Sequence, residues 1–261
     1  MTLTLGPGPL AGRSPADTNY EIDGPKHRLF FEDYPRRMRA LVSDHVVLET
    51  TRGKLLHETG ILPRLYVPID DIDSDVLEAS EHTTHCPFKG DASYWTVKVS
   101  GRRIEDALWH YPEPLEPASW LKGYACLYDE AADLWLQEDE PVRGHLRDPY
   151  HRVDVLATSR QVMVKAGGEV VAESDRPKLL FETGLAPRVY LLRSDIRPGI
   201  LERSEKTTVC PYKGNATYWH VKTAGGVVGD AAWSYETPRP EALAAADHLC
   251  FDGEGIEVEV S

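Results

Sequence analysis

An internal repeat constrains the fold of this 261-residue chain more than any other feature of its sequence. Cys86 and Cys210 lie 124 positions apart, and the same offset relates Trp109 to Trp233. The match needs no gap from residue 54 to residue 128, and apolar positions coincide along it. Because matching apolar patterns specify matching cores, we predict two tandem copies of one domain, each long enough to bury a core by itself.

Upstream of residue 54 the match between the copies changes register. Tyr34 aligns with Tyr150 at an offset of 116 positions, so the second copy would be eight residues longer in this region. The same offset relates Arg36, Ser43 and Val46 to Arg152, Ser159 and Val162. A Gly-Gly turn between valine-rich runs is typical of a β-hairpin. We therefore expect the extra residues to form a hairpin at 165–172, most of which the first copy lacks.

Most local patterns in both copies are typical of β-strands. Residues 256–260 alternate between apolar and charged, and residues 219–223 lead into a Gly-Gly turn and a further valine-containing run. Only 195–203 and 241–247 carry helical signals. We predict an all-β fold of two tandem repeats, each a small domain with one or two short helices. The expected divisions are a flexible N-terminal arm at 1–26, a first repeat domain at 27–136, a polar linker at 137–149 and a second repeat domain at 150–261.

The charge and composition of the chain argue against several classes of protein. Its 29 basic and 42 acidic residues give a formal charge of −13, which repels phosphate backbones and argues against nucleic-acid binding. No apolar run approaches the roughly 20 residues that a membrane-spanning helix needs. Residues 1–17 lack the pattern of a secretory signal. We therefore expect a cytoplasmic protein that has no contact with a membrane.

The cysteines and histidines do not predict a metal or another cofactor. The four cysteines form no Cys-x-x-Cys pair, so all are expected to be reduced, with Cys126 and Cys250 in the core. His82 and His85 beside Cys86 have the spacing of a partial metal site, but no further ligands are visible and the second copy lacks both histidines. The second copy has no histidine near its loop cysteine in sequence, so the sequence offers no shared general base.

Polar and aromatic residues that are identical in the two copies are the candidates for a functional site. Core packing does not require a charge, so the unchanged Arg64 and Arg188 suggest charge partners for a ligand. Unchanged rings such as Trp109 and Trp233 suit the walls of a cleft. An ion-paired aromatic core without a ligand is the alternative interpretation. The candidate ligand-binding residues are Glu58, Thr59, Arg64, Tyr94 and Trp109 in the first copy and Glu182, Thr183, Arg188, Tyr218 and Trp233 in the second.

The strongest candidate is a Cys-Pro-aromatic-Lys-Gly segment, which starts at Cys86 and again at Cys210. It places Lys89 and Lys213 three residues after the cysteines, on a loop that proline and glycine shape. A nearby cation lowers the pKa of a thiol, and the thiolate is the nucleophilic form. These four residues are therefore candidate catalytic residues. A cysteine that is inert beneath the loop is an equally open interpretation, because cysteine is also a common buried residue.

These motifs resemble a bacterial family known as domain of unknown function 427, which occurs singly and in tandem. The resemblance covers both copies through Glu-Thr-Gly, Pro-Arg-x-Tyr, Thr-x-Cys-Pro-aromatic-Lys-Gly-x-Ala-x-Tyr-Trp and Asp-x-x-Trp-x-Tyr. It implies a compact β fold similar to the β-tent of methionine sulfoxide reductase B. It implies little about chemistry, since the chain has neither the Gly-Ser and paired-Asp signature of nucleotidyltransferases nor the paired Cys-x-x-Cys motifs of zinc-bearing β-tents. The first copy departs from the family pattern by the expected lack of its hairpin.

Three functions remain open on these observations. The favoured one is a module that binds a small anionic or planar molecule in an aromatic and cationic pocket beside the cysteine loop. The second is an enzyme whose cysteine nucleophile is activated by the loop lysine. The third is a structural or partner-binding protein without a pocket. A small-molecule ligand is thus the expected partner, and the sequence does not predict an oligomeric state.

Overall fold

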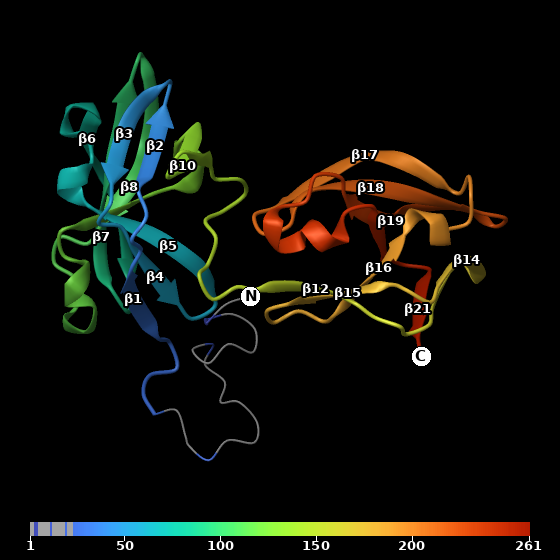
Figure 1. Ribbon diagram of the computed structural model, residues 1–261. Helices are drawn as coiled ribbons and strands as arrows, with labels where there is room; N and C mark the ends of the chain where they lie inside the picture. Colours follow the sequence, from blue (N-terminus) through green and yellow to red (C-terminus); the bar gives the residue numbers. More distant parts are fainter. Residues whose placement is uncertain (1–2, 5–10, 12–18, 20–22) are drawn as a thin grey trace. The chain divides into compact units, whose positions relative to one another are not determined.

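The computed structural model describes residues 3–4, 11, 19 and 23–261 (Figure 1). The chain divides into two compact units, Met1–Asp148 and Pro149–Ser261. Figure 1 shows strands in both units, blue to green in the first and yellow to red in the second. The predicted all-β fold with two tandem repeats is confirmed. Most of the arm predicted at 1–26 lies outside the described residues.

The first unit contains a large and a small antiparallel sheet. Along the large sheet the strands follow in the order β1 (Leu29–Asp33), β4 (Lys54–Glu58), β5 (Ile61–Pro68), β9 (Tyr124–Leu127), β8 (Arg102–His110), β7 (Gly90–Val99) and β6 (Leu77–Cys86). The small sheet has the order β11 (Glu140–Pro141), β10 (Leu134–Gln137), β2 (Met38–Val42) and β3 (His45–Thr50).

The second unit repeats the large sheet of the first unit strand by strand. Its large sheet has the order β12 (Val153–Ala157), β15 (Lys178–Glu182), β16 (Arg188–Leu192), β20 (His248–Phe251), β19 (Gly226–Tyr235), β18 (Gly214–Thr223) and β17 (Leu201–Cys210). Its small sheet contains β14 (Glu169–Ser174), β13 (Val162–Ala166) and β21 (Ile256–Val260). The two large sheets have the same strand order, and β13, β14 and β21 of the second small sheet correspond to β2, β3 and β10 of the first. The sequence repeat is thus also a repeat of the structure.

The hairpin predicted at 165–172 is formed in the second unit as β13–β14, but the predicted change of register is wrong, and so is the expectation that the first copy lacks most of this hairpin. The hairpin β2–β3 lies 124 residues before the hairpin β13–β14, and β1 lies 124 residues before β12. Both turns have two residues of positive φ, Ser43 and Asp44 in the first unit and Gly167 and Gly168 in the second. This geometry is that of a tight hairpin turn, which glycine prefers and aspartate tolerates. The counterpart in the first copy was missed because only its apolar pattern is kept, while the residue identities have changed.

The helices are shorter than the sequence suggests. A helix over 195–203 is not formed, because η5 (Arg193–Asp195) is a single 3₁₀ turn and Gly199, with φ of 77°, precedes strand β17. The signal at 241–247 corresponds to η6 (Pro240–Ala245), which is also 3₁₀. The remaining short helices are η1 (Ile69–Asp71), η2 (Ser74–Val76), η3 (Glu116–Leu121) and η4 (Asp129–Ala131). No helix of the described residues has the length and apolar character that crossing a membrane requires.

Each large sheet has a core cluster on either face, because neighbouring residues of a strand point to opposite sides. In the first unit Trp95 and Val97 pack toward the small sheet, while Tyr94 joins a second, aromatic cluster. Cys126 and Cys250 belong to the aromatic clusters and are each 1% exposed, which confirms their predicted place in the core. Burial raises the pKa of the Cys250 thiol to about 12, so this thiol stays protonated.

The polar segment expected at 137–149 is folded against the first unit over most of its length. Gln137 ends β10 and accepts a hydrogen bond from Tyr34, and β11 pairs with β10. Asp148 is 3% exposed. The first unit therefore continues to Asp148, and the second begins at Pro149.

Candidate functional site

The loop lysine of each copy is paired with the repeated glutamate. Lys89 Nζ donates to Glu58 Oε2, and Lys213 Nζ donates to Glu182 Oε2. All four side chains are largely buried. An ammonium in such surroundings needs a carboxylate partner, because burying an unpaired charge is costly. The geometry therefore favours an anchoring role for both lysines, since their charge is already engaged.

A histidine that the sequence reasoning missed completes each pair. His27 Nε2 lies 2.8 Å from Glu58 Oε1, and His151 Nε2 lies 3.0 Å from Glu182 Oε1. The two histidines are 124 residues apart, and they were overlooked because this region was aligned at the wrong offset. We call each set of histidine, glutamate and lysine a clasp. The clasps are His27, Glu58 and Lys89 in the first unit and His151, Glu182 and Lys213 in the second.

The clasp of the second unit holds its carboxylate ionised. Burial by itself raises the pKa of Glu182, but the hydrogen bonds from His151 and Lys213 outweigh burial and lower this pKa to about 2. At neutral pH the glutamate is therefore an anion that accepts from two donors. Such an anion is an acceptor and not a proton donor, so it suits the fixing of neighbouring groups better than acid catalysis.

The clasp fixes the cysteine loop at several points. The loop aromatic stacks on the clasp histidine, with ring centroids 3.8 Å apart for Phe88 and 3.9 Å apart for Tyr212. The loop ends at a glycine of positive φ, and a Cβ on Gly214 would lie 3.0 Å from the carbonyl oxygen of Thr237. A side chain there would be strained and crowded, which accounts for the glycine. The loop is thus held by its aromatic ring, its lysine and its glycine.

The repeated threonines and loop cysteines lie beside this arrangement. Thr59 and Thr183 accept hydrogen bonds from the backbone N–H groups of Arg28 and Arg152, at 3.0 and 2.8 Å. They therefore fix the chain that enters the first strand of each unit. Cys86 and Cys210 are partly buried free thiols that pack at the margin of the aromatic clusters.

The repeated tyrosine and tryptophan lie opposite each other on neighbouring strands. We call these ring pairs the shelves: Tyr94 and Trp109 in the first unit, and Tyr218 and Trp233 in the second. Each shelf tryptophan donates through Nε1 to a buried tyrosine hydroxyl at 3.1 Å. Each shelf tyrosine hydroxyl is hydrogen-bonded to the hydroxyl of a threonine of the neighbouring strand, at 2.8 and 3.2 Å. The polar tips are thereby satisfied, and the ring orientation is fixed.

The two shelves differ in what covers them. In the first unit the ring of Tyr128 lies 4.5 Å from that of Trp109, and the ring of His82 lies 4.6 Å from that of Tyr94. Tyr94 is only 7% exposed. The second copy has Asp252 instead of a tyrosine at the position that corresponds to Tyr128, directly after strand β20. Both rings of the second shelf are half-buried.

Two cations flank the second shelf. Lys206 Nζ lies 4.3 Å from the ring centroid of Tyr218, and Arg188 Cζ lies 5.8 Å from that of Trp233. Arg188 also pairs with Asp252 at 2.7 Å, as Arg64 pairs with Asp129 at 3.0 Å in the first unit. These arginine pairs are partly exposed, so water screens them.

A β-bulge places Lys206 over its ring. The register between β17 and β18 shifts between Arg203 and Thr207. Asp230, with φ of 50°, faces this bulge and lies 3.6 Å from Lys206 Nζ. The first unit has the same positive φ at Asp106, which accepts from Ser80. The aspartate of the Asp-x-x-Trp-x-Tyr motif thus has a role in shaping the bulge beside the shelf.

Of the predicted site residues, the structure brings Arg188, Tyr218 and Trp233 together at the second shelf. Lys213 and Glu182 instead belong to the clasp. Among the described residues, no three histidine, cysteine, aspartate or glutamate side chains are placed to hold a metal ion. The shelf residue that sequence reasoning missed is Lys206. It lies twelve residues before Tyr218 in the sequence, and the first copy has His82 at its position, so a search for residues that are identical in both copies does not find it.

A family model for a domain of unknown function (DUF427) matches residues 30–138 and again residues 154–261. Each matched stretch contains one cysteine loop, one shelf and the glutamate and lysine of one clasp. The clasp histidines precede the matched residues by three positions in both copies. No curated protein matches the chain.

Proposed function

From the premise that this chain belongs to the DUF427 family and contains its domain twice, we propose that the second unit binds a small planar molecule on its shelf. The ligand stacks on the faces of Tyr218 and Trp233 beside the cysteine loop. Planar ligands commonly bind to aromatic faces, with a few polar groups to orient them.

The observation that carries this proposal is the pair of cations at the rings. Lys206 Nζ lies over the ring of Tyr218 at 4.3 Å and Arg188 Cζ lies over the ring of Trp233 at 5.8 Å, and both rings are half-buried. A ligand with electron-rich or anionic substituents gains attraction from such cations while its ring contacts the shelf. The flanking cations thus favour a planar ligand that carries negative charge.

The loop and clasp support this role as a fixed wall. Cys210 lies at the margin of the same aromatic cluster, and the clasp engages Lys213 and the loop aromatic. A thiol-dependent reaction gains no comparable support, because the lysine that would activate the thiol is bound to Glu182.

A screen of aromatic carboxylates by thermal unfolding of the full chain tests the proposal. A ligand present at about 100 times its Kd adds about 2.7 kcal/mol to the free energy of unfolding, which is a readily measured rise in Tm. We expect Lys206→Met and Trp233→Phe to reduce the rise. The matched changes in the first unit, His82→Met and Trp109→Phe, are expected to leave it unchanged. Equal loss in both units, or no stabilising compound, would contradict the proposal.

A further inference from the structure

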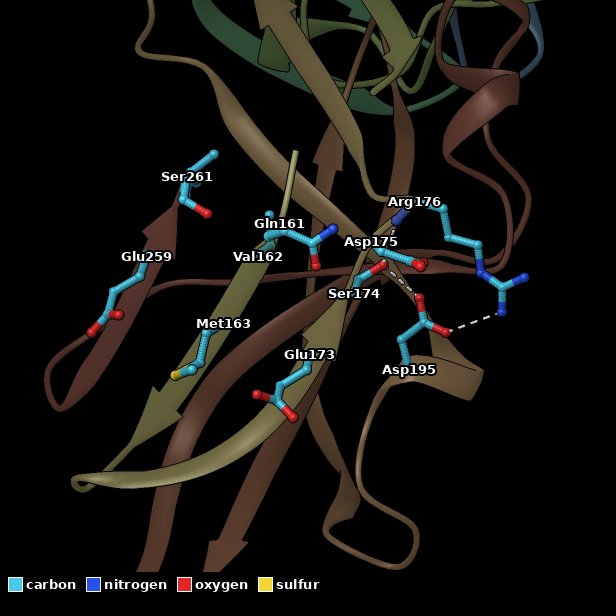
Figure 2. A pocket seen from close by; sticks show the side chains of 11 residues that line it. Gln161, Val162, Met163, Glu173, Ser174, Asp175, Arg176, Asp195, Glu259 and Ser261 are labelled. Atoms are coloured by element: carbon cyan, nitrogen blue, oxygen red, sulfur yellow. Dashed lines mark hydrogen bonds and ion pairs between the residues drawn. The ribbon is translucent and has the colours of Figure 1, made fainter. Parts of the chain in front are cut away.

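The small sheet of the second unit carries a groove of about 690 Å³ (Figure 2). Strands β13, β14 and β21 contribute to its lining, together with the η5 residue Asp195. The lining includes four carboxylate side chains and the single cation of Arg176, which pairs with Asp195 at 3.4 Å. A groove of this size is within the range of ligand sites, and its charge is acidic.

A row of three side chains crosses this groove. Met163 on β13 lies directly opposite Glu173 on β14 and opposite Glu259 on β21. Directly opposed residues of antiparallel strands point to the same face, and Figure 2 shows the three side chains on neighbouring strands. Glu259 pairs with Lys165 at 2.6 Å. The carboxylate of Glu173, in contrast, makes no hydrogen bond or ion pair with any residue that the structure describes, while its backbone belongs to the β13–β14 pairing.

The first unit has arginines at the corresponding positions. Arg39 stands where the second unit has Met163, and Arg37 stands where it has Gln161. The glutamate that corresponds to Glu173 is Glu49, which accepts from Arg37 Nη2 at 2.6 Å and from its Nε at 2.8 Å.

The second arginine of the first unit is engaged as well. Arg39 Nη2 donates to Asp139 at 2.7 Å and to the carbonyl oxygen of Glu138 at 2.7 Å. The first unit therefore supplies guanidinium groups to its own acidic residues at this place. The second unit retains the glutamate, as Glu173, but has the uncharged Gln161 and Met163 in place of the two arginines.

We propose that the groove of the second unit docks an arginine side chain from an extended basic segment of a partner protein. The guanidinium takes the place at Glu173 that Arg37 takes at Glu49 in the first unit. The apolar stem of the arginine packs along Met163, which shares this face of the sheet with Glu173 and Glu259, as arginine stems commonly do on apolar surface. A second copy of this chain is a poor occupant, because its own Arg37 and Arg39 are engaged and its net charge is −13.

Titration of the full chain with a synthetic peptide tests this inference. The probe is acetyl-Gly-Val-Arg-Val-Arg-Gly-amide, followed by ¹H–¹⁵N NMR at low ionic strength, with a peptide in which glutamate replaces both arginines as the control. We expect shifts at Met163, Glu173 and Glu259 with the arginine peptide only. Glu173→Gln should weaken binding about fivefold, the effect expected for one partly exposed ion pair. The matched Glu49→Gln should have no effect.

A second variant imitates the first unit. The double change Gln161→Arg and Met163→Arg gives the groove its own guanidinium groups and should abolish peptide binding. If this variant does not fold, Glu173→Gln decides the question. The inference is overturned if the arginine peptide causes no shifts in the groove, if the glutamate peptide binds equally well, or if Glu49→Gln weakens binding as much as Glu173→Gln does.

Discussion

The first unit covers with its own side chains two places that the second unit leaves more open. Tyr128 lies against Trp109 in the first shelf, whereas cations flank the half-buried rings of the second. Arg37 binds Glu49 in the first unit, whereas the carboxylate of Glu173 has no partner among the described residues of the second. In contrast, the strand order of the large sheet and the clasp are the same in both units. The two copies of this duplicated domain thus share the contacts that hold each of them together and differ in the side chains of their surfaces.

The clasp is the strongest test of what the units share. Glu58→Ala or Glu182→Ala leaves a buried lysine without its carboxylate, and we expect each to lower the free energy of unfolding by about 3–5 kcal/mol. Native-state hydrogen exchange assigns the loss to one unit. Glu113→Ala, which removes an exposed partner of Lys122, should cost under about 1 kcal/mol.

The paired apolar change Glu182→Leu with Lys213→Met should restore most of the lost stability, because it removes both buried charges together. If only one of the variants Glu58→Ala and Glu182→Ala lost this stability, the clasp would not be a shared element and the comparison would fail.

The acid stability of the second unit provides a test that needs no loss of a side chain. The folded-state pKa of Glu182 is about 2, below its unfolded-state value of about 4.3. A depressed pKa contributes stability that is present above pH 4.3 or so and is lost as the pH falls toward 2. We expect about 2 kcal/mol to be lost over this range. Urea unfolding at several pH values measures it, and Glu182→Gln should flatten the dependence. Parallel curves for the two proteins would refute this assignment.

The cover of the first shelf offers the test with the smallest effect on stability. Tyr128→Ala removes the ring over Trp109, and we expect a cost of about 1 kcal/mol, the typical effect of one substitution. With His82→Lys added to supply the cation that the second shelf has in Lys206, an aromatic carboxylate that binds the second shelf should then bind two sites per chain instead of one, as measured by calorimetry. Tyr124→Ala, which removes a ring that contacts Phe31, is the matched control. A stoichiometry that stays at one would show that Tyr128 is not what separates the two shelves.

The sequence predicted some of the candidate site and missed other parts for identifiable reasons. Placing Arg188 near Trp233 followed from their identity in both copies, and the structure brings them together. The clasp histidines were missed because a few coincidental identities favoured an offset of 116 over the true 124. Lys206 was missed because the first copy has His82 there, so a comparison of identities discards it.

By itself the sequence determined the two all-β copies and the burial of Cys126 and Cys250. It could do so because the repeat and the alternation of apolar residues are local or one-dimensional patterns. Only the tertiary structure decided which charges meet. Glu58 lies 31 residues from His27 and also 31 residues from Lys89, and no local periodicity links such distances. The order of the strands brings these side chains together, and burial then makes their pairing obligatory, because an unpaired charge in the interior is too costly.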